Sequence, residues 1–356
     1  MSTPLSDATD AGYRAASSAS ARAGRLRVGV GLLIGAGAIY AVASSAGGFA
    51  TAVSALRSAR PGWLGAGAVA EATSYVVLGL LLRRLVGDRV SRLTAVRLGL
   101  VVAGLGNVLP AAPAEGLTMA GAELRRRGVD THRTRIALGL MQWLSIRTLF
   151  GVAALDALAV AAVAGVRYPR QAPGAVVLGA IAVAVLGALA ATAWLASRRQ
   201  TMEFLMLAAA RARFWQPASP AAHHRAQGAA WHAEIREALG SKRTQAAFGG
   251  LALISCLAEA TCFRCALVAV GVHLKPGMFL FAYAVAIIAA LVPLVPAGLG
   301  VVETVVPALL HHAGVPLATA LAGVLAYRAL GTLLPAVCGT GALIRLRMTV
   351  MVAKEP

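Results

Sequence analysis

Seven ionisable side chains stand inside long apolar stretches of this sequence. They are Glu71, Arg147, Asp156, Glu259, Arg264, Glu303 and Arg328. In hydrocarbon a charged side chain costs from ~2.5 to over ~10 kcal/mol unless it is paired or hydrated, so such residues mark substrate or ion pathways. A guanidinium can hold a phosphate through two parallel hydrogen bonds. Glu303 and Arg328 are therefore the strongest candidates for chemistry, either as a lipid phosphate site or as an internal salt bridge, and the two roles can coexist.

A broken apolar stretch, residues 279–328, must position this pair. The apolar run is interrupted at Pro293 and Pro296 and turns through Gly298 and Gly300 before it resumes. Each arm is short for a helix that needs about 20 residues to cross the hydrocarbon. Helix breakers at this depth are tolerated where the freed backbone is buried in protein or lines a watery cavity. We therefore predict a re-entrant hairpin, with a proline-kinked spanning helix as the alternative.

A second broken stretch, residues 98–127, has the same character. It is interrupted at Pro110 and Pro113, carries Asn107 and Glu115, and ends in three consecutive arginines. The same reasoning predicts a second re-entrant hairpin here.

The composition excludes an ordinary soluble domain. The chain has 356 residues, of which 58% are hydrophobic, and a mean hydropathy of +0.74. Repeated apolar stretches of this length are typical of an all-α polytopic membrane protein. The net charge of +19 fits loops rich in arginine that face anionic lipid on the inner side of a membrane. No basic domain with interleaved aromatic residues exists to bind nucleic acid, so nucleic acid is not an expected partner.

Neither the cysteines nor the histidines have metal-site spacing. Cys262 and Cys265 form a C-x-x-C pattern inside a predicted spanning helix without a second ligand pair. The two adjacent histidine pairs, at 223–224 and 311–312, lack the spacing of a helical zinc site. We expect no metal, no cofactor and no catalytic residues.

The chain divides into a tail and one membrane domain. Residues 1–24 are rich in small polar residues and are expected to form a disordered cytoplasmic tail, and residues 25–356 form a single transmembrane domain. About six spanning helices are predicted, at 28–46, 63–82, 136–163, 174–196, 246–270 and from 317 onward. The run at 28–46 has the alternative of a cleaved signal peptide. Residues 198–243 form the only long polar segment and are expected to be a cytoplasmic loop with helices lying on the membrane surface.

Treating both broken stretches as hairpins gives two inverted halves, residues 28–165 and 174–343. The arginine-rich loops, the 198–243 segment and both termini then fall on the cytoplasmic side. A single offset of 186 residues relates Pro110 to Pro296, Gly128 to Gly314 and Gln142 to Arg328. Inverted repeats whose broken helices meet near the midplane are typical of transporters that alternate access around a central site.

These motifs resemble a known family, the transmembrane flippase-like region of lysylphosphatidylglycerol synthases, which also occurs as stand-alone membrane proteins. The resemblance rests on PAGLGVVE at 296–303, GV at 314–315 and YR at 327–328, and in the first half on NVLP at 107–110, Glu115 and RRRGV at 125–129. It covers nearly the whole chain and implies movement of a lipid between leaflets. One departure concerns the helix after the first hairpin, where an expected Glu-Arg pair and a nearby Asp read Met141, Gln142 and Ser145. The soluble aminoacyl-transferase domain of the synthases has no counterpart in this sequence.

We therefore expect a lipid flippase or lipid-carrier translocase in the plasma membrane, a transporter rather than an enzyme. Its partners would be membrane lipids, either an anionic phospholipid or a polyprenyl-type carrier. An ion-coupled transporter of a small polar solute and an intramembrane lipid-modifying enzyme are the alternatives. The sequence has no nucleotide-binding P-loop. The candidate substrate-binding residues are Asn107, Pro110, Glu115, Arg147, Pro296, Gly298, Gly300, Glu303, Tyr327 and Arg328.

Overall fold

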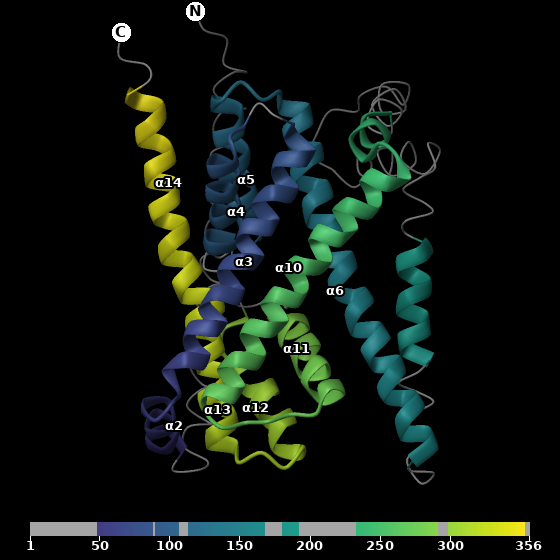
Figure 1. The fold of residues 1–356 in the computed structure, drawn as a ribbon, viewed down its shortest axis with the longest axis vertical. Coiled ribbons are helices and arrows are strands. Elements are labelled where there is room, and N and C mark those ends of the chain that lie inside the picture. Colours follow the sequence, from purple (N-terminus) through teal and green to yellow (C-terminus); the bar gives the residue numbers. More distant parts are fainter. Residues whose placement is uncertain are drawn as a thin grey trace, which may run out of the picture.

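The computed structural model describes residues 48–87, 90–106, 113–167, 180–191, 233–290 and 298–352, and within these ranges every regular element is a helix (Figure 1). The elements are α2 (Gly48–Arg57), α3 (Pro61–Val86), α4 (Arg92–Gly106), α5 (Pro113–Arg126), α6 (Thr131–Arg167), α10 (Lys242–Ala269), α11 (Pro276–Ala290), α12 (Val302–His312), α13 (Leu317–Arg328), the π-helical segment η3 (Ala329–Leu333) and α14 (Leu334–Val352). Two shorter helices lie at Ala180–Ala191 and at 233–239.

Four helices in the described ranges are long and apolar enough to cross a membrane. They are α3, most of α6 (Thr131–Val163), α10 and the continuous α13–η3–α14 helix over Leu317–Met348. They correspond to four of the six predicted spans. The predicted first helix at 28–46 and the tail at 1–24 lie outside the described residues, and only Ala180–Ala191 is described of the predicted span at 174–196. The protein is a multi-pass helical membrane protein.

Two pairs of shorter helices occupy the broken stretches. Helices α4 and α5 pack against each other in the upper half of Figure 1, and α11 and α12 pack against each other in the lower half. The two helices of each pair run in opposite directions. In Figure 1, α4 descends and α5 returns towards the top, whereas α11 ascends and α12 returns towards the bottom. The connections at 107–112 and 291–297 lie outside the described residues.

The two halves repeat the same order of elements and the same helix-ending turn. A short helix, a long helix, a pair of half-length helices and a second long helix follow one another from α2 and again from 233–239. After α5 the amides of Gly128 and Val129 bond to the carbonyls of Arg125 and Leu124, and the Gly314–Val315 turn after α12 makes the same two bonds. Both glycines have positive φ, of 76° and 90°. This is the Schellman motif, which requires a left-handed residue, so the predicted pairing of Gly128 with Gly314 has a structural basis. Helices α6 and α14 extend past the predicted ends of the halves, to Arg167 and Val352.

Each half-length pair has its own hydrophobic core. One cluster joins the C-terminal part of α3 to α4, α5 and the start of α6 through buried residues such as Leu82, Leu98 and Leu124. The other joins the C-terminal part of α10 to α11, α12 and α13 through Phe263, Tyr283 and Leu310. Helices α3 and α10 lie side by side and run in opposite directions through both regions (Figure 1).

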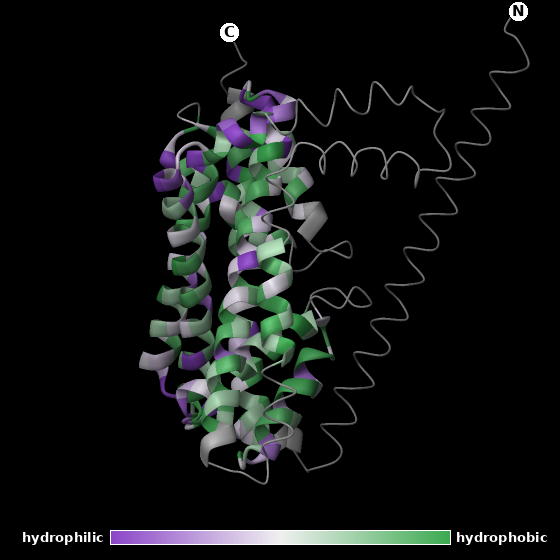
Figure 2. Ribbon diagram, turned by 90° about the vertical axis from the view of Figure 1, so that its right-hand side faces the viewer, coloured by the Kyte–Doolittle hydropathy of each residue, from purple (hydrophilic) through white to green (hydrophobic). Residues whose placement is uncertain are grey.

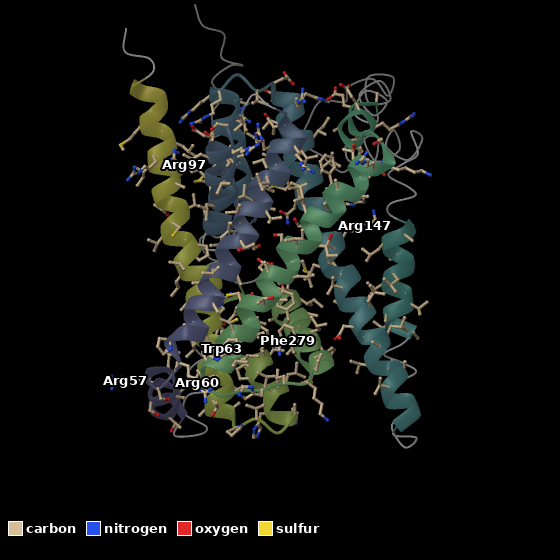
Figure 3. The ribbon with its side chains drawn as sticks, viewed as in Figure 1. Arg57, Arg60, Trp63, Arg97, Arg147 and Phe279 are labelled. Carbon is tan, nitrogen blue, oxygen red and sulfur yellow. The ribbon has the colours of Figure 1, made fainter. Side chains whose placement is uncertain are left out.

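Polar residues gather at the two ends of the molecule, and its middle is apolar (Figure 2). The end at the top of Figures 1 and 2 receives the arginine pairs and clusters at 83–84, 125–127, 133–135 and 345–347. The opposite end carries fewer cations, among them Arg57 and Arg60, which Figure 3 shows beside the start of α3. The charge is therefore asymmetric along the long axis.

Glycines allow the closest contacts between helices. A Cβ added to Gly339 of α14 would lie 2.6 Å from the carbonyl oxygen of Leu100 in α4, and one added to Gly79 of α3 would lie 2.5 Å from the Cα of Val96 in α4. Small residues at such contacts let backbones approach, which is how helices associate within a membrane. Helix α4 is thereby held between α3 and α14.

We predict that Gly339→Ala lowers thermal stability and that Gly341→Ala, two positions along the same helix, does not. A Cβ at Gly341 would meet nothing within 4 Å, so there alanine should be neutral or slightly stabilising because it favours the helix. At Gly339 the backbone of α4 must shift, which costs roughly 1–3 kcal/mol. Thermal unfolding of the two purified variants in the same detergent measures the difference, and equal melting temperatures would contradict the close packing of α4 on α14.

Candidate functional site

The predicted Glu303–Arg328 pair exists and is buried. The Nε of Arg328 donates to Oε1 of Glu303 over 2.7 Å, and the other carboxylate oxygen of Glu303 accepts the backbone N–H of Gly300, also over 2.7 Å. Glu303 is 3% exposed and Arg328 is 8% exposed. The charge of each side chain is therefore balanced within the protein, and α12 is tied to the end of α13.

The turn that precedes α12 depends on two glycines. Gly298 and Gly300, through which we predicted the chain to turn, both have positive φ, of 63° and 84°. A Cβ on Gly298 would also lie 2.6 Å from the Cα of Ala290, the last residue of α11. Glycine is the only residue that combines this backbone conformation with so close an approach. Pro296 lies outside the described residues.

Tyr327 lies between Arg328 and a group of aromatic rings. It is 8% exposed, and its ring meets that of Phe263 edge to face, with the centroids 5.0 Å apart and the planes at 80°. The π-helical segment η3 begins directly after Arg328. Single turns of this kind within α-helices frequently mark functional positions.

The first half does not reproduce this arrangement. Glu115 belongs to α5, and Asn107 and Pro110 lie outside the described residues. Gln142 is partly buried in α6 at the position that the repeat pairs with Arg328. Arg147 is exposed on α6, with its guanidinium 5.1 Å from the centroid of the Trp143 ring. Figure 3 shows Arg147 in the upper half of the view, whereas α12 and α13 lie in the lower half. The described part of the first half therefore brings no buried arginine to its hairpin.

A second group of polar residues contains Glu71 and Glu259, two of the seven ionisable residues named above that were not among the candidate substrate-binding residues; Glu71 is buried and Glu259 is partly buried. Glu71 and Tyr75 lie on α3, and Glu259 lies on α10. Glu71 is 2% exposed, and Tyr75 donates its phenolic proton to Oε1 of Glu71. The sequence carried a signal for this group: Ala-Glu-Ala-Thr occurs at 70–73 and again at 258–261. This short repeat, at an offset of 188 residues instead of the 186 found above, gives Glu71 and Glu259 matching positions within Ala-Glu-Ala-Thr in the two halves.

The antiparallel packing of α3 and α10 brings these matching positions together. Ser74 and Ser255 share a hydrogen bond of 2.8 Å between the two helices. On the other side of Glu71, Gly67 lies against Cys262, whose carbonyl oxygen would be 3.5 Å from an added Cβ. Since contacts at 67 with 262 and at 74 with 255 bracket the two glutamates, both carboxylates stand at the middle of the helix pair.

The two glutamates differ in how their oxygens are bonded. Oε2 of Glu259 accepts the hydroxyl proton of Tyr283 from α11 over 3.1 Å. Oε2 of Glu71 is buried and has no hydrogen-bond partner. The charges of the two carboxylates act on each other. In the described part of the chain no lysine, arginine or histidine forms an ion pair with either glutamate.

The cysteines near this group are free. Cys256, Cys262 and Cys265 are buried and Cys338 is exposed. Within the described ranges no three His, Cys, Asp or Glu side chains gather as the ligands of a metal ion would.

Two small cavities open near the ends of the molecule, each beside an arginine. One of about 140 Å³ is lined by Arg264, His273 and Phe279. The other, of about 160 Å³, is lined by Arg126, Arg347 and the buried Glu123, which forms ion pairs with Arg126 and Arg127. Figure 3 shows Phe279 in the lower part of the molecule, so the first cavity lies towards the end with fewer cations.

Most of the chain matches a known protein family. The family described as the lysylphosphatidylglycerol synthase TM region matches residues 28–339. No curated protein matches the chain.

We predict a graded loss of stability when alanine replaces three glycines. Gly250→Ala should be tolerated, because this residue is helical and a Cβ would meet nothing within 4 Å. Gly314→Ala meets open space too but has a φ of 90°, so it should cost roughly 1–2 kcal/mol of backbone strain. Gly298→Ala should cost most, because it adds a clash with Ala290 to the same kind of strain. Melting temperatures of the three variants test this order, and a Gly298→Ala protein as stable as Gly250→Ala would contradict the turn described above.

Proposed function

The chain belongs to the family of lysylphosphatidylglycerol synthase TM regions, and from this premise we propose that it moves an anionic lipid between the leaflets of a membrane. The observation that carries the proposal is the buried Arg328–Glu303 pair at the tip of a half-length helix pair. A buried arginine inside a membrane protein is expensive and is characteristic of a site that meets a charged substrate. The family supports a membrane role in general terms, and the choice of lipid transport is our inference.

The half-length pairs support alternating access as the mode of transport. We propose that α4–α5 and α11–α12 are re-entrant hairpins that enter the membrane from opposite sides. Their arms have 15, 14, 15 and 11 residues, fewer than the about 20 needed to cross. Inverted halves with broken helices at mid-depth allow one half to rock against the other around a fixed site.

Arg328 would recognise the phosphate of the lipid. A phosphodiester offers a guanidinium the same pair of acceptor oxygens as a carboxylate, so a lipid head group would compete with Glu303 for Arg328. When no lipid is bound, Glu303 balances the cation and avoids the large cost of an unpaired buried charge. Release of Glu303 would also loosen α12 from α13, which links binding to movement of the hairpin.

The charge asymmetry supports an orientation with the arginine-rich end in the cytoplasm. Positively charged loops are retained on the cytoplasmic side of the membrane. The N-terminus, the C-terminus and residues 198–243 would then all be cytoplasmic. The protein would act as a transporter and carry out no chemical reaction on its lipid.

We predict that an impermeant thiol reagent labels His312→Cys in intact cells and does not label Glu237→Cys. Both positions are exposed and lie at opposite ends of the molecule. The native exposed cysteine, Cys338, should first be replaced by serine so that it gives no background. Permeabilised cells should label both variants. Labelling of Glu237→Cys alone in intact cells would contradict the orientation.

We further predict that lipid transport requires the guanidinium of Arg328. In Glu303→Gln/Arg328→Gln both buried charges are removed together, so the protein should fold and yet fail to equilibrate a labelled anionic phospholipid in vesicles. Arg328→Lys should remain at least tenfold slower than the wild type because lysine lacks the bidentate fork.

The control is Arg264→Gln, which removes an exposed arginine of α10 and should leave transport near the wild-type rate. Transport by the double variant at the wild-type rate, at matched protein level, would leave the pair with a structural role only and would contradict the ligand role.

A further inference from the structure

We propose that Glu71 and Glu259 form a shared proton-binding site, and that this site couples the proposed lipid transport to a proton gradient. This inference rests on the proposed function and adds the source of energy. It starts from the position of the two glutamates: one from each half, at matching places in a repeated Ala-Glu-Ala-Thr sequence, brought together by the packing of α3 on α10.

The surroundings of the pair favour a bound proton. Two ionised carboxylates that act on each other in a low-dielectric interior repel strongly, and a shared site of this kind keeps one group neutral. Tyr75 and Tyr283 each donate one hydrogen bond to the pair, and Oε2 of Glu71 is left without a partner. A proton on the pair removes one of the two negative charges, and the unpartnered oxygen offers it a place.

In the part of the chain that the structure describes, the charged and titratable groups around the pair do not supply a compensating cation. Helix α10 contributes Cys256 and Cys262, α11 contributes Tyr283, and α13 contributes Tyr327 and Arg328. Arg328 is already paired with Glu303. The other helices packed against α3 bring Arg97 from α4 and Arg147 and Asp156 from α6, and none of these forms an ion pair with Glu71 or Glu259.

A sodium ion fits this site less well than a proton. Hard metal cations are bound by several oxygen atoms whose lone pairs point at the ion. Here the tyrosine hydroxyls point hydrogen atoms at the carboxylates, and the thiol of Cys262 is a further neighbour of Glu71. The apolar surroundings and the repulsion between the two carboxylates favour a neutral carboxyl group, and the two tyrosine hydrogen bonds offset this only in part.

Tyr327 connects the proton site to the proposed lipid site. Its ring meets that of Phe263, which lies four residues after Glu259 on α10, and it directly precedes Arg328 in the chain. The two glutamates belong to different halves, so any rocking of one half against the other changes their separation. When the carboxylates move apart the repulsion falls and the proton can leave, which links its release to the change of access.

The test uses the full-length protein in vesicles with a pH difference of about one unit and the membrane potential held at zero. If one proton moves with each lipid, a labelled anionic phospholipid should accumulate about tenfold across the leaflets at steady state, since a tenfold proton gradient is worth the same free energy as a tenfold lipid gradient. Glu71→Gln and Glu259→Gln should both lose this accumulation. Asp156→Asn, which changes another buried acid with an unpartnered oxygen, should retain it.

A second measurement needs no transport. Infrared difference spectra of the purified protein at neutral pH should contain the carbonyl band of a protonated carboxyl group, and that band should weaken in Glu71→Gln. Glu123→Gln is the matched control, because Glu123 is equally buried but paired with arginines, and it should leave the band unchanged.

The outcomes separate this inference from the proposed function. Lipid that equilibrates but ignores the pH gradient, follows a sodium gradient instead, or loses its pH response in Asp156→Asn would overturn the proton site and leave lipid transport standing. The proton site would also be overturned if the wild-type protein has no carboxyl band, or if the band is as strong in Glu71→Gln as in Glu123→Gln. No transport of any labelled lipid by the wild type would overturn the proposed function, while the infrared result would still decide whether the pair holds a proton.

Discussion

The contact between α3 and α10 is the interaction on which the rest of this fold depends. These two antiparallel helices pack closely against each other: α3 supports α4 in the first hydrophobic core, and α10 has buried residues in both cores. The contact is narrow because its interface residues are small: Gly67, Ser74, Ser255 and Cys262. Larger side chains would separate the helices, and the two glutamates at the centre would lose their proximity. The same contact therefore produces both the close helix packing and the pair of glutamates. Because ionisable groups inside a membrane are costly, such a pair is a candidate functional site.

A second constraint comes from the backbone of the half-length helices. Inside hydrocarbon the N–H and C=O groups freed at a broken helix must find partners within the protein. At the start of α12 the side chain of Glu303 accepts the N–H of Gly300, and Thr304 returns a hydrogen bond to the carbonyl of the same glycine. Glu303 therefore serves the backbone with one oxygen and Arg328 with the other. This double use explains why a glutamate rather than an apolar residue stands at this position, and it makes the turn and the arginine parts of one unit.

The sequence predicted what depends on local pattern. Apolar runs, helix breakers and the motif around Gly298 and Gly300 were enough to predict a helical membrane protein, a turn at both glycines, and a Glu303–Arg328 salt bridge as one of two roles for those residues. It did not predict facts that depend on how helices face one another. Arg147 was a candidate because of its position along α6, but the rotation of that helix exposes it beside Trp143. The π-helical segment after Arg328 has no sequence signature that we recognised. The glutamate pair was within reach, because Ala-Glu-Ala-Thr occurs twice, yet only the antiparallel packing of α3 on α10 shows that the two copies meet.

The two halves are alike in their backbone and unlike in their charge, and this difference has a mechanistic consequence. The Schellman turns after α5 and α12 repeat closely, but Arg328 is paired by the repeat with Gln142. A fully symmetric transporter would offer its substrate equivalent sites on the two sides of the membrane. Here the buried guanidinium stands only at the second hairpin among the described residues, so an anionic head group would be held by α12 and α13 whichever side is open. The first half-length pair, α4–α5, would then act as a gate without a buried arginine of its own. Under the proposed mechanism one arginine is sufficient, because what alternates is access to Arg328 and not the site itself.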